Sequence, residues 1–190
     1  MNSSTPGESM PIQRAAPRPI RDAADNNVLE LTWDVFGELC RALAVKVAQS
    51  GYAPEIVVGI AKAGVIPGAV VASMLGCDFF SMKISRDTDT GKMRARPKII
   101  QAAPREAINK RVLIVDELTT SGDTLRMATN ALRQVGPAEI RTATNFVKVG
   151  SFKPDYYALE ATGTVVFPWD RQLVTQAGDL VTNPFYSEIL

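Results

Sequence analysis

The chain has 190 residues, of which 46% are hydrophobic and 22% are charged, and its formal net charge is +1. This length predicts one domain with a full hydrophobic core, and the balanced charge gives no field that would recruit nucleic acid or a membrane surface. The sequence contains no histidine, which excludes serine–histidine nucleophilic sites and histidine-based zinc sites. The chemistry must therefore come from carboxylates, hydroxyls, backbone dipoles, lysine, arginine and any bound Mg²⁺.

Three further features bear on location and organisation. Cys40 and Cys77 lie in apolar surroundings without metal-ligand spacing, so we expect reduced thiols in a cytoplasmic protein. The most apolar stretch, residues 63–77, is interrupted by Gly, Pro and Ser and is shorter than the roughly 20 residues of a membrane-spanning helix. Residues 1–27 are proline-rich with little to bury, which predicts a flexible leader before a single domain over 28–190.

The predicted elements alternate between helices and strands. In chain order they are a helix over 33–49 with Thr32 as N-cap, a strand over 55–60, a helix over 67–75, strands over 79–84 and 112–115, a helix over 123–135, and strands over 139–148 and 165–167. Such alternation is typical of an α/β fold with a doubly wound parallel sheet.

The run at 112–124 reads Val-Leu-Ile-Val-Asp-Glu-Leu-Thr-Thr-Ser-Gly-Asp-Thr. A buried strand here places Asp116 and Glu117 at its carboxyl end, where ligands bind in open α/β sheets. The loop that follows leads into a helix N-terminus and offers backbone N–H groups to an anion. Two carboxylates beside an anion site suit a sugar phosphate or a magnesium-bound diphosphate. The alternative is an ordinary strand–turn–helix corner with solvated acids.

A second loop of the same kind occupies residues 59–68. Lys62 is the only charge in this otherwise apolar turn, and small Ala63 and Gly64 let the backbone approach a diphosphate. Taken alone, the loop is equally typical of a simple turn with Lys62 in solvent. A Walker-type loop is excluded because Val65 stands where its lysine should be, and no G-x-G-x-x-G follows any strand.

Together these two runs resemble the 5-phosphoribosyl-1-diphosphate (PRPP) signature and the diphosphate loop of the type I phosphoribosyltransferases. Lys148, the Val-Val-Phe-Pro-Trp-Asp run at 165–170 and the Leu-Thr-Trp-Asp run at 31–34 are similar to the 6-oxopurine branch, most closely the bacterial xanthine-guanine phosphoribosyltransferases. The resemblance covers about residues 29–171. It implies the type I phosphoribosyltransferase fold, with a flexible hood loop and a small C-terminal base-binding region.

The resemblance also implies roles by position. Asp116 and Glu117 would act in catalysis by holding the ribose hydroxyls and, together with PRPP and water, the Mg²⁺ cofactor. The cradle of the 5′-phosphate would consist of Thr120, Ser121, Gly122, Asp123 and Thr124. The diphosphate would meet Lys62, Ala63 and Gly64, with Lys62 also catalytic. The base would meet Lys148 at its 6-oxo group and the backbones of Val165 and Asp170. Trp169 is expected in the core and is not counted in the site.

Residues 85–98 hold five cations around acidic residues and a glycine: Arg86, Lys92, Arg94, Arg96 and Lys98. An irregular insertion of this length is usually functional or disordered. The functional interpretation is a hood that closes over PRPP and excludes water, because the sugar cation formed in the reaction would otherwise be hydrolysed. A solvated surface loop is the other interpretation. The sequence does not identify which cation reaches the diphosphate.

Two positions depart from the purine branch. Thr164 replaces an aromatic residue that stacks on the base, and Thr120 replaces an aspartate that assists removal of a base proton, which threonine cannot do. Branches that act on orotate or adenine carry a small neutral residue at the latter position. We therefore expect transfer from PRPP to a nucleobase, a 6-oxopurine first. The alternatives are a PRPP- or nucleotide-binding regulator and transfer to a non-standard acceptor. The resemblance further implies a homodimer or homotetramer, with neither nucleic acid nor membrane as partner.

Overall fold

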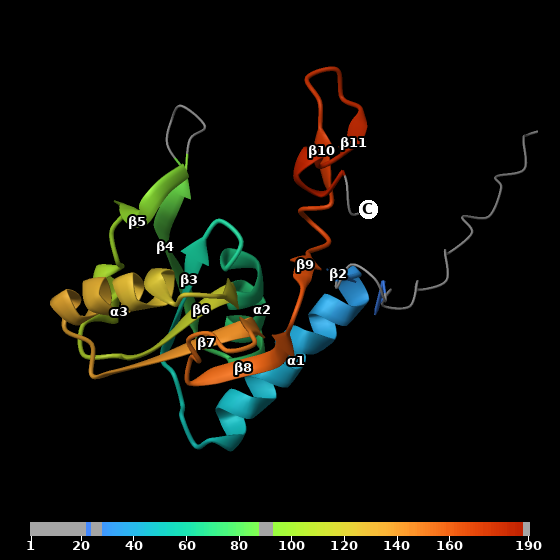
Figure 1. Cartoon of the computed structure of the whole chain (residues 1–190). Helices are drawn as coiled ribbons and strands as arrows, with labels where there is room; N and C mark the ends of the chain where they lie inside the picture. Colours follow the sequence, from blue (N-terminus) through green and yellow to red (C-terminus); the bar gives the residue numbers. More distant parts are fainter. Residues whose placement is uncertain (1–21, 24–27, 88–92, 188–190) are drawn as a thin grey trace, which may run out of the picture.

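The computed structural model describes residues 22–23, 28–87 and 93–187 (Figure 1). The strands of its central sheet are β3 (Ile56–Ala61), β4 (Asp78–Asp87), β5 (Met93–Gln101), β6 (Arg111–Thr119), β7 (Glu139–Lys148) and β8 (Tyr156–Ala161). They lie in the order β5-β4-β3-β6-β7-β8. Every neighbouring pair is parallel except β4 and β5, which are antiparallel. The predicted α/β fold with a parallel sheet is confirmed, except that the edge strand β5 is antiparallel.

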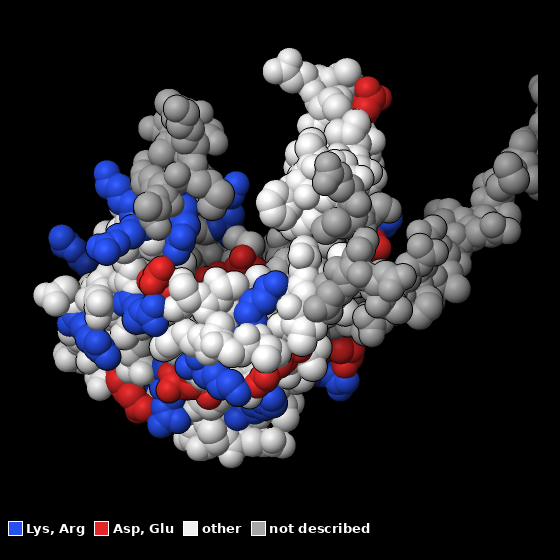
Figure 2. Space-filling view, viewed as in Figure 1, with Lys and Arg blue, Asp and Glu red and all other residues white. Residues whose placement is uncertain are grey.

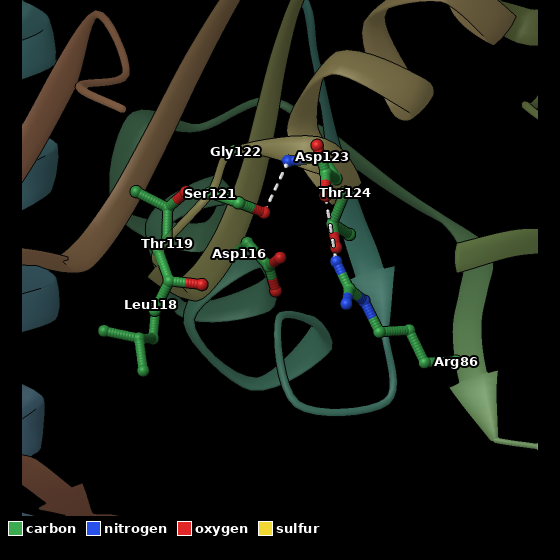
Figure 3. A pocket seen from close by; sticks show the side chains of 9 residues that line it. Arg86, Asp116, Leu118, Thr119, Ser121, Gly122, Asp123 and Thr124 are labelled. Carbon is green, nitrogen blue, oxygen red and sulfur yellow. Dashed lines mark hydrogen bonds and ion pairs between the residues drawn. The ribbon is translucent and has the colours of Figure 1, made fainter. Parts of the chain in front are cut away.

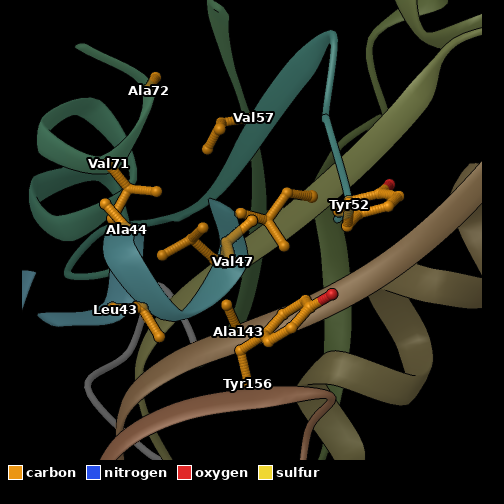
Figure 4. Close-up of a cluster of buried hydrophobic side chains, with 11 residues drawn as sticks. Leu43, Ala44, Val47, Tyr52, Val57, Val71, Ala72, Ala143 and Tyr156 are labelled. Carbon is orange, nitrogen blue, oxygen red and sulfur yellow. The ribbon is translucent and has the colours of Figure 1, made fainter. Parts of the chain in front are cut away.

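Helices cover both faces of this sheet. Helices α1 (Trp33–Gln49) and α2 (Val65–Leu75) pack on one face, and α3 (Asp123–Val135) packs on the other. Because side chains alternate along a strand, Val57 and Leu113 face the first pair of helices, whereas Val58 and Ile114 face α3. Figure 4 shows Val47 of α1 and Val71 of α2 over the same side of the sheet as Val57. The sheet is therefore doubly wound.

Helix α1 has the bounds that its apolar spacing predicted. The backbone N–H of Val35 donates to the Thr32 hydroxyl at 3.3 Å, so Thr32 is its N-cap. Gly51 follows the helix with a φ of 78°, a left-handed conformation that favours glycine. Helix α2 begins two residues before its predicted start, and it is only partly core, since Val70 and Met74 are exposed while Val71 is buried.

Several strands differ from the prediction. Strand β6 runs on to Thr119, so Asp116 and Glu117 lie within it instead of after its end. The charged segment predicted as an irregular hood consists instead of the ends of β4 and β5, and its tip, residues 88–92, lies outside the described residues. Strand β8 was missed, because its sequence alternates weakly between buried and exposed positions. The long-range antiparallel pairing of β4 with β5 overrides the polar composition of the segment.

A second, smaller sheet pairs strands from the N-terminal and C-terminal parts of the chain. It joins β1 (Asp22–Ala23), β2 (Val28–Glu30) and β9 (Thr164–Val166), with β2 parallel to β9. Beyond β9 follow the hairpin β10 (Gln172–Val174) and β11 (Leu180–Thr182) and the 3-10 turn η2 (Pro184–Tyr186), whereas η1 (Arg105–Ala107) precedes β6. Apart from β1, the predicted leader lies outside the described residues.

Two further expectations concern the state of the two cysteines and membrane-spanning helices. Cys40 is buried, Cys77 is half-buried, and both are free thiols. Burial raises the pKa of the Cys40 thiol to about 11, which keeps it protonated and unreactive at neutral pH. Among the described residues, no helix combines the length and apolar character needed to cross a membrane.

Candidate active site

The site begins where the order of the strands reverses. From β3 the chain moves to β4 on one side and then crosses to β6 on the other, so the loops after β3 and β6 diverge at a topological switch point. Strands β3 and β6 pair from Ile56 and Val112 to Gly59 and Val115. Beyond that point β6 continues along β7 alone, with Asp116 opposite Thr144. The separation of β3 from β6 opens the crevice in which the two acids stand.

The loop after β3 contacts strand β6 at Gly64. A Cβ on Gly64 would lie 2.7 Å from Asp116 Oδ1 and 2.8 Å from the carbonyl oxygens of both Ile60 and Val115. Only glycine fits, because a carbon at these distances would overlap two backbone carbonyls. The peptide bond between Ala61 and Lys62, at the start of this loop, is cis. The predicted diphosphate loop is thereby fixed directly against the predicted carboxylate.

The first pocket is formed by the loop after β6 and has a volume of about 310 Å³ (Figure 3). Its lining residues are Arg86, Asp116, Leu118, Thr119, Thr120, Ser121, Gly122, Asp123 and Thr124. All five residues of the predicted 5′-phosphate cradle are among them. The α3 N-terminus opens here, and the first N–H groups of a helix have no partner within it. The pocket therefore presents hydroxyls and backbone N–H groups, the donors that a phosphate needs.

Asp116 is nearly buried at the edge of this pocket. Its Oδ1 accepts a hydrogen bond from the Glu117 backbone N–H at 3.1 Å. Burial raises the pKa of the Asp116 carboxyl well above its usual range, and the negative charge of Glu117 raises it further. Without a ligand, the ionised form of Asp116 is thus held at a cost, which a bound hydroxyl or cation would offset.

We expect the single change Asp116→Asn to stabilise the ligand-free protein. The pKa of Asp116 is raised by folding from an ordinary value near 3.8. As the pH rises from this ordinary value through the folded-state pKa, the wild type loses stability by about 1.4 kcal/mol per pH unit. Asparagine has the same shape and no charge, so the variant should melt at a higher temperature at pH 7. Thermal unfolding in EDTA at pH 3.5 and pH 7 measures this; an equal difference at both values would contradict it.

The cradle has its own charge balance. Asp123 Oδ2 lies 3.0 Å from Arg86 Nη2, and Asp123 Oδ1 lies 2.8 Å from Arg126 Nη2. Hydrogen bonds from the side chains of Arg126 and Ser121 lower the pKa of the Asp123 carboxyl. Two arginines thus neutralise the one carboxylate of the cradle, which leaves its helix terminus attractive to a phosphate. Of the five hood cations, Arg86 is placed in this pocket, and Arg96 lies instead in a separate surface depression.

Gly122 shapes the cradle in the same way as Gly64 shapes the first loop. Its φ is 76°, and a Cβ there would lie 2.4 Å from Phe152 Cγ. The left-handed conformation turns the chain sharply from β6 into α3. The backbone N–H of Phe152 in turn donates to the Thr120 carbonyl at 3.2 Å. The loop is therefore held from behind by the segment after β7.

A second pocket of about 570 Å³ adjoins the first. Its lining residues are Lys62, Ala63, Ile66, Glu117, Leu118, Lys148, Thr164, Val165, Phe167, Trp169, Asp170, Phe185 and Tyr186. Leu118 lines both pockets. Because successive side chains of a strand point to opposite sides, Asp116 faces the first pocket and Glu117 the second. Figure 2 shows the surrounding cleft between the basic β4–β5 ribbon and the mostly uncharged C-terminal hairpin.

The predicted base-binding residues meet in this second pocket, but two of them have internal partners. Lys148 Nζ donates to the carbonyl of Gly163. The Asp170 N–H donates to the Phe167 carbonyl at 3.0 Å, and the Asp170 carbonyl accepts from Asn183 Nδ2 at 2.8 Å. The Asp170 carbonyl therefore has one lone pair left for a ligand, and Lys148 has two further donors.

A model of the phosphoribosyl transferase domain family matches residues 31–174. The chain belongs to this family. It is 27% identical to the xanthine-guanine phosphoribosyltransferase of Gluconobacter oxydans over 143 residues, which cover 74% of this chain and 83% of that enzyme. It is 31% identical over 98 residues to the orotate phosphoribosyltransferase of Phenylobacterium zucineum, covering 52% of this chain and 46% of that enzyme.

The purine phosphoribosyltransferase of Pyrococcus horikoshii has the same fold with a TM-score of 0.66 and 28% identity, covering 79% of this chain and 99% of the other. The predicted membership of the phosphoribosyltransferase family is thus confirmed, and the chain is a phosphoribosyltransferase. The matched range also agrees with the 29–171 span of the resemblance.

Some residues of the site escaped the sequence analysis. Trp169, assigned to the core, both packs on Phe36 and Phe167 and lines the second pocket of this phosphoribosyltransferase. Phe185 and Tyr186 reach the pocket from η2, fifteen residues or more after the predicted tail motif, and no local signal marks them. Thr119 and Arg86 lie within the runs 112–124 and 85–98 but were not assigned to the site. They reach the first pocket because β6 and β4 extend beyond their predicted ends.

The acids also bear on the predicted Mg²⁺. Asp116 and Glu117 offer carboxylate oxygens, the ligands that Mg²⁺ prefers. In the described part of the chain, no group of three or more His, Cys, Asp or Glu side chains could hold a metal ion. The residues present fit an ion that takes most of its oxygens from PRPP and water.

Proposed function

We propose that this phosphoribosyltransferase transfers the 5-phosphoribosyl group of PRPP to a nucleobase and releases diphosphate, with guanine, xanthine or hypoxanthine as the first candidates. One observation carries the proposal: adjacent acids on β6 face two adjoining pockets, one built for a phosphate and one lined by Lys148 and aromatic rings. The purine enzymes among the relatives support the same substrate class.

In this proposal the ribose lies across Asp116 and Glu117. Its 5′-phosphate occupies the cradle from Thr120 to Thr124, and its hydroxyls bind the two carboxylates. The negative charges of these acids then favour the positive charge that develops on the sugar as diphosphate leaves, an electrostatic contribution of the kind that dominates many enzymes. Fixing the phosphate at one end and the base at the other sets the reacting carbon near the attacking nitrogen.

The leaving group would meet the loop after β3. Lys62 supplies a positive charge beside the second pocket, and Ala63 and Gly64 let the backbone come close. Mg²⁺ bound with PRPP would add positive charge to the diphosphate, held by Asp116 and Glu117 through their carboxylate oxygens. Lys148 would donate to the 6-oxo group of the base with a proton that Gly163 does not use, and Val165 and Asp170 would contact its ring edge.

The assembly and location belong to the same proposal. The family resemblance supports a homodimer or homotetramer, which light scattering on the purified protein tests. The free thiols of Cys40 and Cys77 support a cytoplasmic location.

Diphosphate release from PRPP tests the function directly. The panel contains guanine, xanthine, hypoxanthine, adenine and orotate, each with and without Mg²⁺. We expect at least one 6-oxopurine to be consumed in equal amount to the diphosphate released, and only with Mg²⁺. Consumption of orotate or adenine alone would overturn the 6-oxopurine assignment. Tight PRPP binding without consumption of any base would support the nucleotide-binding regulator instead.

A further inference from the structure

The second pocket, which we propose binds the base, is lined by aromatic rings although Thr164 supplies none. Four rings line it, those of Phe167, Trp169, Phe185 and Tyr186. Phe167 is buried and stacks on Trp169, with ring centroids 4.8 Å apart and planes 16° from parallel. Phe36 also makes an edge contact with Trp169, with the ring centroids 4.7 Å apart. Phe167 and Trp169 therefore already pack against each other, and Trp169 also packs against Phe36.

The remaining two rings differ in their exposure to solvent. Tyr186 is 5% exposed, and its hydroxyl donates to Asp170 Oδ2 at 2.6 Å, so it serves to anchor η2. Phe185 is 79% exposed. Within the described residues its ring packs against one other ring, that of Tyr186, in an edge contact with the ring centroids 5.0 Å apart. Trp169 is only partly exposed, so Phe185 is the most exposed of the four rings at the pocket.

The backbone of Phe185 is nevertheless fixed. Asn183 Oδ1 accepts a hydrogen bond from the Phe185 N–H at 3.1 Å, and Asn183 Nδ2 donates to the Asp170 carbonyl at 2.8 Å. On the other side, Tyr186 is held by Asp170 and packs against Val28 and Val166. The exposed ring is therefore carried on an anchored turn, which lowers the entropy lost when a ligand stacks on it.

We propose that Phe185 is the stacking platform for the nucleobase, in place of the ring missing at Thr164. This inference rests on the proposed function and adds a specificity-determining residue to it. A flat aromatic face in the pocket that Lys148 and Val165 also line suits a planar heterocycle, since bases stack on aromatic side chains through their π-faces. Phe185 lies beyond the residues that the family model matches, so the family pattern does not supply it.

Replacing the ring should weaken base binding selectively. We expect Phe185→Ala to raise KM for the base that the wild type uses best by roughly 5- to 150-fold, the loss of one base–aromatic stack, with KM for PRPP unchanged. Phe185→Trp should retain wild-type values. Phe185→Leu keeps apolar bulk without a π-face and should behave like alanine. Val174→Ala is the matched control, because Val174, which is 69% exposed on the neighbouring hairpin, is also an exposed apolar residue and lines neither pocket.

Calorimetry of product binding separates this inference from the proposed function. GMP, XMP and IMP are titrated into wild type and Phe185→Ala, with ribose 5-phosphate as the ligand that lacks a base. Weaker binding of a nucleotide with unchanged ribose 5-phosphate binding supports the platform even if turnover fails. Equal nucleotide affinity in both proteins, or full affinity in Phe185→Leu, overturns it. A wild type that binds no nucleotide overturns both.

Discussion

The double change Asp116→Asn, Glu117→Gln should reduce kcat by at least about 10²-fold while the protein stays folded, because preorganised charge at the reacting centre contributes on that scale. Both changes preserve shape and remove charge. The variant would keep the hydrogen bond from residue 117 to the side chain at 116 but could no longer favour a positive charge on the ribose.

The measurement is diphosphate release under saturating PRPP and base, with circular dichroism to verify folding. Glu55→Gln is the control: Glu55 pairs with Lys110 at 3.1 Å at the opposite, amino end of the sheet. We expect that control to retain the wild-type rate. A double variant that turns over within a few-fold of wild type would refute the roles assigned to both acids.

Gly64→Ala should damage both stability and activity. Its new Cβ would overlap Asp116 Oδ1 and the carbonyls of Ile60 and Val115, and two of these three neighbours are backbone atoms that cannot rotate away. Overpacking of this kind costs about 1–3 kcal/mol. Displacing the Lys62 loop or Asp116 by as little as about 1 Å can cost roughly 10²-fold in rate. Denaturant unfolding and diphosphate release measure the two effects.

Gly37→Ala provides the matched comparison. Gly37 lies within α1, and a Cβ there would meet no atom within 4 Å. Alanine is favoured over glycine in a helix interior by about 1 kcal/mol, so this variant should be more stable than wild type with unchanged turnover. If Gly64→Ala proved as harmless as Gly37→Ala, the contact between the first loop and Asp116 would not constrain the site.

The site was most predictable where its geometry is local. The order of apolar strand, Asp116, Glu117 and a hydroxyl-rich loop specifies a strand, a turn and a helix start over thirteen consecutive residues, of which Asp116 and residues 118–124 line the first pocket. Helix α1 was equally predictable, because its apolar spacing and the Thr32 cap act within a few turns of chain. The roles assigned to these residues remain predictions until the variants are measured.

Prediction failed where pairing partners are distant. Strands β4 and β5 extend through a charged segment because each satisfies the hydrogen bonds of the other, which neither sequence reveals alone. The contact of Gly64 with Asp116 joins the loop after β3 to strand β6 and likewise has no local signature.

By itself, the sequence determined the family, the alternation of helices and strands and the loops that carry charge, since these depend on residues close together in the chain. Only the tertiary structure decided that the two acids face different pockets, that Arg86 pairs with Asp123, and that Phe185 lines the same pocket as Thr164. The physical reason is that such contacts are created by packing between elements far apart in sequence, and no local pattern encodes them.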